Sequence, residues 1–237
     1  MIDNGRHINI GSLLFEGLDQ IDLTGPFEVL SRLPNSTYRV YAKTLAPIRD
    51  VKGLRLAADA TLADAPQLDV LHVPGGFGQE DLMDDAEVLD WIAQQAKRGP
   101  RRILGLHGRP ALWRGGPLDR SSRDHPLGVL PSSASAPIKE RVVVDGDWVF
   151  AAGVTAGIDG ALQLTANLRG EDVARGIQLY MAYAPEPPFN SGTPEGAPAA
   201  VLDKARASLV QLTKRREQTA RKIAERLGVT ATPLDPF

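Results

Sequence analysis

The stretch Arg101-Arg-Ile-Leu-Gly-Leu-His-Gly-Arg-Pro-Ala111 predicts a strand that turns sharply into a helix. Its apolar run Ile103–Leu106 is typical of a buried strand, and Pro110 suits the first turn of a helix, where the missing N–H costs nothing. Such a turn lifts one side chain above the sheet edge and directs backbone N–H groups to the same place, as in a nucleophile elbow. The residue at the tip is His107 rather than Ser or Cys. On spacing alone, an ordinary turn with an incidental histidine fits equally well.

Strand-like and helix-like segments alternate along the chain, which predicts an α/β fold with a mostly parallel sheet. The predicted strands span 8–15, 37–42, 68–73 and 103–106, with a short β excursion at 51–57 and a hairpin at 142–150 that turns at Asp145-Gly146. Five helices are predicted. The first begins at about Thr24, the second spans 80–98, and the third follows the segment 153–160 and ends at about 168. The last two span 171–183 and about 199–228. The polar stretch 119–137, rich in Ser and Pro, predicts a long loop.

Three candidate site elements each follow a predicted strand. They are Asp22, placed just before the first predicted helix, the turn Pro74-Gly75-Gly76, and His107. Ligands of open parallel sheets bind outside the carboxyl ends of the strands, so we expect these elements to converge. Asp22 also fits the commoner role of a helix-capping residue. The glycines resemble a phosphate-binding turn, but neither Gly-x-Gly-x-x-Gly nor a Walker lysine accompanies them.

The composition narrows the function classes. A chain of 237 residues with 43% hydrophobic residues builds one full-sized domain, and a net charge of −2 argues against nucleic acid or an anionic membrane as partner. There is no cysteine, so disulfides, thiolate metal sites and thiol nucleophiles are excluded. The four histidines show no metal-ligand spacing, and no metal site is expected. The polar segment 1–7 and the absence of a long apolar run predict a cytoplasmic protein.

Five motifs follow one another in order along the chain. They are Asp19-Gln-Ile-Asp-Leu-Thr-Gly-Pro26, Val73-Pro-Gly-Gly76, Gly153-Val-Thr-Ala-Gly-Ile-Asp159, Tyr183-Ala-Pro-Glu-Pro-Pro-Phe-Asn190 and Lys214-Arg-Arg-Glu217. This ordered set resembles the DJ-1/PfpI superfamily, and more closely its isocyanide hydratase branch. The resemblance runs from residue 8 to about 228 and so covers nearly the whole chain.

The resemblance implies a flavodoxin-like three-layer sandwich, a single domain over 1–237, a homodimer and chemistry without a cofactor. In isocyanide hydratases the elbow carries a nucleophilic Cys followed by Thr and Gly, and an Asp before the first helix hydrogen-bonds that Cys. Backbone N–H groups at the elbow and at the Pro-Gly-Gly turn stabilise developing negative charge. The matching residues here are Asp22 and Gly75-Gly76.

The departure from that pattern lies at the reactive position itself. His107 replaces the Cys, Gly108-Arg109-Pro110 replaces the small residues after it, and Ser121-Ser-Arg-Asp124 stands where relatives carry Thr-Thr-His-Trp. Without a thiolate, the covalent hydratase route is excluded.

Two interpretations remain open. In the first, His107 and Asp22 form an acid–base pair that acts on a small molecule without a covalent intermediate, as a step in specialised biosynthesis. The residues that would receive negative charge or hold the substrate are Gly75, Gly76, Gly108, Arg109, Arg123 and Thr155. In the second, the site is catalytically inactive and the protein binds a ligand or a partner.

A transcription regulator is a third class that the sequence disfavours. The stretch 218–229 resembles the first half of a helix-turn-helix, but Pro233 and Pro236 forbid a recognition helix in the few residues that follow. A charged amphipathic helix packed on the domain or on its dimer mate fits the last predicted helix better.

Overall fold

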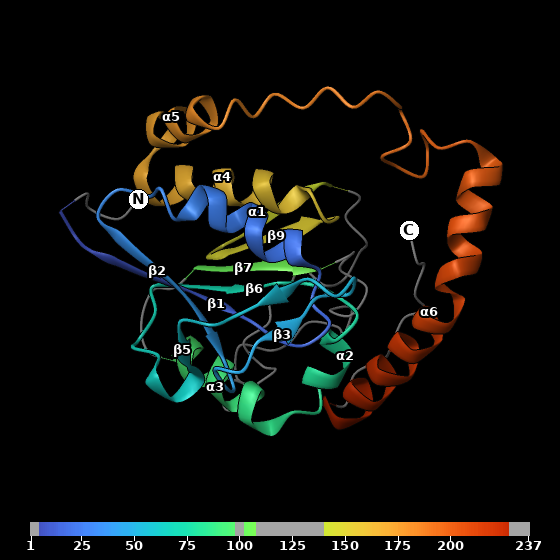
Figure 1. Ribbon diagram of the computed structural model, residues 1–237, viewed down its shortest axis with the longest axis horizontal. Coiled ribbons are helices and arrows are strands. Elements are labelled where there is room, and N and C mark those ends of the chain that lie inside the picture. Colours follow the sequence, from blue (N-terminus) through green and yellow to red (C-terminus); the bar gives the residue numbers. More distant parts are fainter. Residues whose placement is uncertain (1–4, 98–101, 108–139, 228–237) are drawn as a thin grey trace.

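A mostly parallel sheet between two layers of helices forms the centre of the molecule, as Figure 1 shows. The computed structural model describes residues 5–97, 102–107 and 140–227, and of 102–107 it describes the backbone alone. Within these residues seven strands form one sheet in the order β5-β2-β1-β6-β7-β9-β8. Their bounds are β1 Ile8–Leu13, β2 Ser36–Ala42, β5 Ala60–Thr61, β6 Val70–Val73, β7 Arg102–His107, β8 Val142–Asp145 and β9 Trp148–Ala152.

The strand order identifies the topology. Counted along the chain, β2-β1-β6-β7-β9 follow the order 2-1-3-4-5 of flavodoxin-like sheets, and every neighbouring pair among them is parallel. The switch point of this order, where ligands of such sheets bind, lies between β1 and β6. The edge strand β8 is antiparallel to β9, and a small two-stranded ribbon pairs β3 (Ile48–Arg49) with β4 (Arg55–Leu56). The predicted α/β, mostly parallel fold is confirmed.

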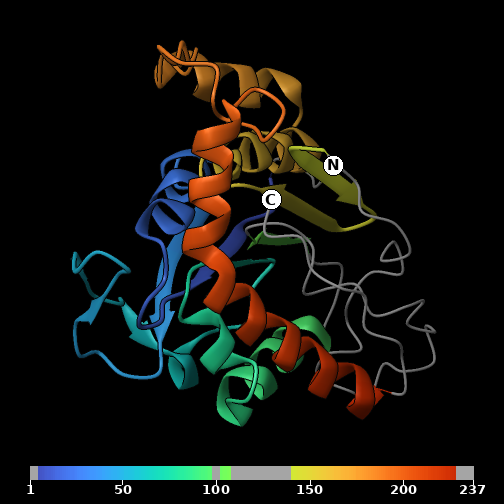
Figure 2. The same cartoon turned by 90° about the vertical axis from the view of Figure 1, so that its right-hand side faces the viewer.

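The helices cover the two faces of the sheet. On one face lie α1 (Gln20–Leu30) and α4 (Ala156–Arg169), with α5 (Glu171–Tyr180) packed on α4. On the other lie α2 (Gln79–Leu82) and α3 (Ala86–Lys97), near the short 3-10 helix Leu62–Asp64. The long α6 (Ala199–Leu227) stands at the side of the body, and Figure 2 shows it crossing in front of the other elements. Within the described ranges, none of the helices combines the length and apolarity needed to cross a bilayer.

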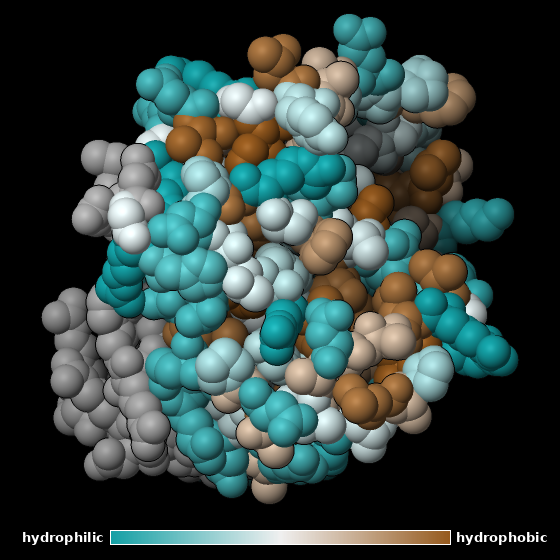
Figure 3. Space-filling model, turned by 60° about the vertical axis from the view of Figure 1, so that its left-hand side comes forward, coloured by the Kyte–Doolittle hydropathy of each residue, from teal (hydrophilic) through white to brown (hydrophobic). Residues whose placement is uncertain are grey.

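The core has two halves because successive side chains of a strand point to opposite faces. Ile8 and Ile10 of β1 belong to the buried cluster under α1 and α4. Leu13 of the same strand belongs to the cluster that Trp91 of α3 covers. On the face that Figure 3 shows, hydrophobic side chains form separate patches among hydrophilic ones.

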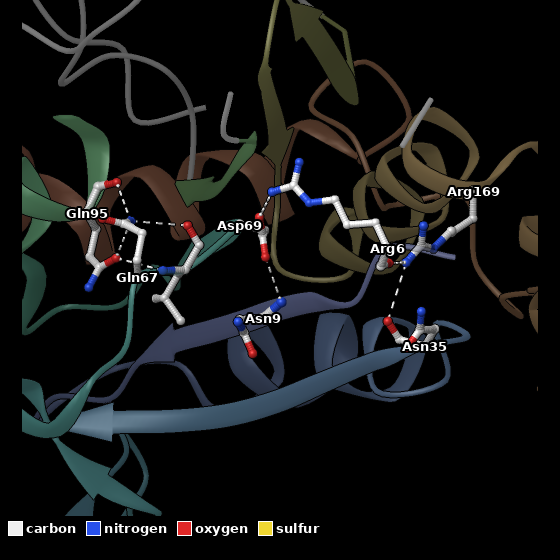
Figure 4. A network of polar contacts seen from close by, with 8 residues as sticks. Arg6, Asn9, Asn35, Gln67, Asp69, Gln95 and Arg169 are labelled. Carbon is white, nitrogen blue, oxygen red and sulfur yellow. Dashed lines mark hydrogen bonds and ion pairs between the residues drawn. The ribbon is translucent and has the colours of Figure 1, made fainter. Parts of the chain in front are cut away.

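A polar network fixes the amino edge of the sheet, opposite the switch-point edge, and Figure 4 shows it at close range. The Asp69 carboxylate, just before β6, accepts hydrogen bonds from the backbone N–H of Asn9 at 2.9 Å and from Arg6 at 2.6 Å. Arg169, the last residue of α4, donates to the carbonyls of Arg6 at 2.6 Å and Asn35 at 3.3 Å. The network ties the starts of three parallel strands to a helix end.

The first helix begins earlier than predicted. Asp19, not Thr24, is its N-cap, and the Asp19 side chain accepts a hydrogen bond from the Ile21 N–H at 3.3 Å. Asp22 therefore lies inside the first turn of α1 rather than before it. Pro26 lies in the helix interior. Because proline has no N–H, the carbonyl of Asp22 four residues earlier loses its helical donor.

The single helix predicted at 80–98 is two helices. The break follows Leu82, and Asp85 starts the second helix by accepting a hydrogen bond from the Val88 N–H at 3.3 Å. Lys43 binds the same carboxylate at 2.7 Å, which adds a tertiary reason for the break. The predicted end of this helix at residues 98–100 lies outside the described residues.

The carboxyl-terminal elements follow the prediction closely. The hairpin is present, but its pairing of Asp145 with Trp148 places the turn at Gly146-Asp147, one residue later than predicted. The helix predicted at 171–183 ends at Tyr180, and Ala182 then adopts a positive φ of 48°. The helices at α4 and α6 are where the sequence places them. The predicted loop at 119–137 lies outside the described residues.

Candidate active site

Three neighbouring strands deliver the candidate residues to one edge of the sheet. β1 leads into α1 with Asp22, β6 leads into the glycine turn, and β7 ends at His107. Because β1 pairs in parallel with β6, and β6 with β7, their carboxyl ends meet at the same edge. The His107 backbone pairs with Ala152 of β9. The structure describes only the backbone of His107, so the direction of its side chain is not described. Gly108, Arg109 and Arg123 lie outside the described residues.

The glycine turn after β6 is paired, backbone to backbone, with the loop that precedes α1. The N–H of Asp19 donates to the Gly75 carbonyl at 3.0 Å, the N–H of Gly78 donates to the Gly17 carbonyl at 3.0 Å, and Leu18 and Gly76 form an antiparallel bridge. A Cβ on Gly76, whose φ is 142°, would lie 2.4 Å from the Cα of Leu18. Gly76 is therefore required for the close approach of the two loops.

This pairing places a backbone donor at the Asp22 carboxyl group. Asp22 is 4% exposed, and its carboxyl accepts a hydrogen bond from the Gly75 N–H. The other oxygen, Oδ1, is buried and has no hydrogen-bond partner among the described residues. Burial, followed by the negative charge of Asp19, raises the pKa of Asp22 to about 7, and the Gly75 N–H partly opposes this rise. A buried carboxyl group that titrates near neutrality with one free oxygen is suited to proton transfer.

A second buried polar group lies beside it, and sequence reasoning did not single it out. His72 of β6 is fully buried, and its Nδ1 lies 2.5 Å from the Ser12 hydroxyl and 3.2 Å from the Tyr38 hydroxyl. Burial lowers the pKa of His72 to about 3, although the backbone of Asp22 acts in the opposite direction. The imidazole is therefore neutral at physiological pH. The available signals were a serine and a histidine, each within an otherwise apolar buried strand.

Thr155 is placed in a different polar cluster. It precedes α4, and its hydroxyl accepts a hydrogen bond from Arg141 at 3.0 Å. Arg141 also binds Asp159, whose other oxygen accepts from the Tyr183 hydroxyl at 2.9 Å. The structure thus brings together Asp22, Gly75 and Gly76, whereas the hydrogen bond described for the Thr155 side chain joins it to Arg141. Among the residues described, His, Asp and Glu side chains nowhere gather in threes as a metal ion would require.

Comparison with known proteins identifies the family. The DJ-1/PfpI family model matches residues 9–167. The chain belongs to the DJ-1/PfpI family. It is 40% identical over 225 residues to an isonitrile hydratase of Pseudomonas putida, a match that covers 94% of this chain and 99% of the relative. The family resemblance drawn from the motifs is confirmed.

Solved structures of the family agree with the fold. A ThiJ/PfpI family protein from Pseudomonas syringae superposes with a TM-score of 0.77 at 29% identity, covering 91% of both chains. DJ-1beta of Drosophila melanogaster superposes with a TM-score of 0.60 at 18% identity, over 76% of this chain and all of DJ-1beta. The family model ends within α4, so α5, the segment after it and α6 lie beyond the matched part.

Proposed function

We propose that this protein is a cofactor-free small-molecule enzyme of the hydratase, lyase, cyclase or isomerase type, which works by non-covalent acid–base catalysis. The observation that carries the proposal is the buried Asp22 carboxyl, with a pKa of about 7 and one oxygen free, at the sheet edge where β7 ends in His107. The relationship to an isonitrile hydratase supports a hydratase-type enzyme. The chain has no cysteine, so the reaction proceeds without a thiolate.

In the proposed mechanism, His107 and Asp22 share a proton. An imidazole and a carboxyl group that share a proton titrate as a coupled pair rather than as two separate groups. Asp22, held on one side by the Gly75 N–H, would orient the ring and set its charge, and His107 would move the substrate proton. Proton transfer of this kind contributes about 10²–10⁴-fold to a rate.

The remaining groups would bind the substrate. N–H groups at Gly76 and Gly108 would stabilise developing negative charge, as in an oxyanion hole, and Arg109, Arg123 or Thr155 would hold an anionic or carbonyl group. We further propose that the enzyme acts as a homodimer in the cytoplasm, in a specialised biosynthetic pathway.

Turnover by site variants tests the mechanism. Against a substrate found by screening small carbonyl, nitrile and isocyanide compounds, His107→Ala and Asp22→Asn are each expected to lower kcat by about 10²-fold or more, with substrate binding largely kept. Asp90→Asn is the matched control, because it makes the same chemical change at an exposed position on α3. Full turnover in both site variants would leave the ligand-binding interpretation as the function of this site.

Alkyl isocyanides separate the two chemical routes. No formamide product is expected from the wild-type protein, since addition of a thiolate to the isocyanide carbon requires a cysteine. Product formation is measured by mass spectrometry with an active isonitrile hydratase as positive control. Formamide production that His107→Ala abolishes would show that a histidine supports the hydration, and our assignment of the reaction would be wrong.

A further inference from the structure

The segment after α5 forms an arm that extends away from the body. Residues 184–198 form no helix or strand, and α6 follows as a helix of 29 residues. The arm leaves the body beside α5 and carries α6 to the opposite side of the molecule, as Figure 1 shows. Arg215, in the second half of α6, lies 3.7 Å from Asp81 of α2, and the two form an exposed ion pair.

The first half of α6 has an apolar face that its own chain covers incompletely. Leu202, Ala205, Leu209 and Leu212 follow the spacing of an amphipathic helix and are only half-buried. At the edges of this face Val201 is 53% and Val210 is 43% exposed. No residue of α6 whose burial the structure describes is fully buried. Since helices in water are stabilised mainly by packing of the apolar face, this half needs a further partner.

A groove of matching character lies between α1 and α5. It has a volume of about 750 Å³, and Phe27, Val173, Ile177 and Tyr180 are among the residues that line it. No residue of α6 contributes to its lining. Because α6 of the same chain lies on the other side of the molecule (Figure 1), the occupant of this groove comes from elsewhere.

Charge favours a second copy of the chain as the source. Residues 199–227 carry eight Lys or Arg and three Asp or Glu, a net charge of +5, so the rest of the chain, at −2 overall, carries −7. The groove itself is close to neutral, because Arg32 pairs with Glu28 and Arg175 pairs with Glu171 and Asp172. The charge difference therefore lies between the basic helix and the acidic remainder of the chain. A basic amphipathic helix and an apolar groove on a body of opposite net charge are complementary between two copies.

We propose that residues 199–213 of each copy pack into the α1–α5 groove of a second copy, so that two arms are exchanged in a closed two-fold dimer. The arm exchange describes the proposed homodimer in more detail and rests on it. It does not depend on the proposed acid–base chemistry. An extended segment of 15 residues spans about 50 Å, which is enough to reach across to a partner. Because α6 also contacts α2, directly after the glycine turn, the arm links the dimer to the edge that carries the candidate site.

The cysteine-free chain allows the contact to be mapped directly. Gly176 lines the groove, and a Cβ there meets no atom within 4 Å, so Gly176→Cys does not disturb the fold. Chains with Gly176→Cys are mixed with chains carrying Val210→Cys and treated with a short bis-maleimide. A covalent heterodimer is expected. In the control experiment, chains with Leu54→Cys take the place of chains with Gly176→Cys. Leu54 is exposed and lies away from the groove, so no heterodimer is expected.

Oligomeric state separates the possible outcomes. Sedimentation is expected to show a dimer whose dissociation constant rises about tenfold or more in Val210→Glu, because a charge replaces an apolar contact. The matched control Leu54→Glu, at a side chain 51% exposed, leaves it unchanged. A monomeric wild type would overturn both the dimer and the arm exchange. The arm exchange would be overturned by a dimer that is insensitive to Val210→Glu. It would also be overturned by a monomer whose α6 binds nucleic acid or anionic vesicles. Neither outcome affects the turnover test of the proposed chemistry.

Discussion

Asp22→Asn is expected to stabilise the fold at alkaline pH and to destabilise it at acidic pH. Raising the pKa of a carboxyl group from 3.8 to about 7 costs about 4 kcal/mol of stability once the group is ionised in both states. Asparagine removes this cost but leaves an amide N–H beside the site of the unpartnered Oδ1, which costs about 2 kcal/mol. The net effect at pH 8 is a gain of about 2 kcal/mol, or about 4–8 °C in Tm.

The sign of the effect follows from the direction of the pKa shift. The cost is absent below about pH 3.8, where folded and unfolded chains are both protonated, and it grows as the pH rises to about 7. The variant therefore crosses from less stable to more stable than the wild type between about pH 4 and pH 8. Chemical denaturation across this range measures the crossing. A constant difference at all pH values would mean that Asp22 is ionised in the folded protein.

His72 provides a control whose effect on the pH dependence of stability has the opposite sign. Its folded pKa of about 3 lies below the ordinary 6.5, so its contribution to stability is complete above 6.5 and is lost as the pH falls toward 3. Between about pH 6.5 and 4 the folded wild type holds a proton on Asp22, whereas the unfolded chain holds one on His72. Both states then bind the same number of protons at these two residues, so their contributions to the pH dependence of stability cancel. His72→Gln should gain stability on acidification in this range, whereas Asp22→Asn should lose it.

Gly76→Ala is expected to cost about 3 kcal/mol or more and to disturb the Asp22 carboxyl. The added Cβ would lie 2.4 Å from the Cα of Leu18 and 2.5 Å from the N of Asp19, both backbone atoms that cannot rotate away. The two paired loops must separate, and the Gly75 N–H then leaves its carboxylate acceptor. Thermal unfolding measures the cost, and the pH crossing described for Asp22 should shift.

Gly153→Ala separates the loss of stability caused by a steric clash from the loss caused by the backbone conformation. Gly153 also has a positive φ, 109°, but a Cβ there meets nothing within 4 Å. Its replacement should cost only about 1–2 kcal/mol, the usual penalty of a left-handed alanine. If the two variants proved equally unstable, the loop pairing would contribute nothing beyond the φ requirement at Gly76.

The sequence predicted the elements that short-range patterns specify and missed those that depend on contacts between distant residues. Apolar runs identified β1, β6 and β7, the strand at β2 was also predicted, and the long charged pattern predicted the bounds of α6. The start of α1 was misplaced because Thr24 and Pro26 resemble a helix start, whereas the capping side chain is that of Asp19. The break before α3 depends partly on Lys43, a residue 42 positions away from Asp85.

The candidate site was predicted in its outline but not in its detail. The convergence of Asp22 and the glycine turn follows from the rule for the carboxyl ends of parallel strands. The hydrogen bond from Gly75 to Asp22 does not, because it requires the bridge between Leu18 and Gly76 to be known. The placement of His72 beside Ser12 is a matter of register between β1 and β6, which a pattern of residue types does not determine.

The backbone bridge between the loops at Leu18 and Gly76 has an evolutionary consequence. It holds the carboxyl group of Asp22 through main-chain atoms of β6 and its turn, so the acid keeps its place whatever side chain ends β7. The residue at the end of β7 can therefore change in evolution without a change in the position of the acid. Such a scaffold lets evolution vary one strand end while the fold and the place of the buried carboxyl group are inherited unchanged.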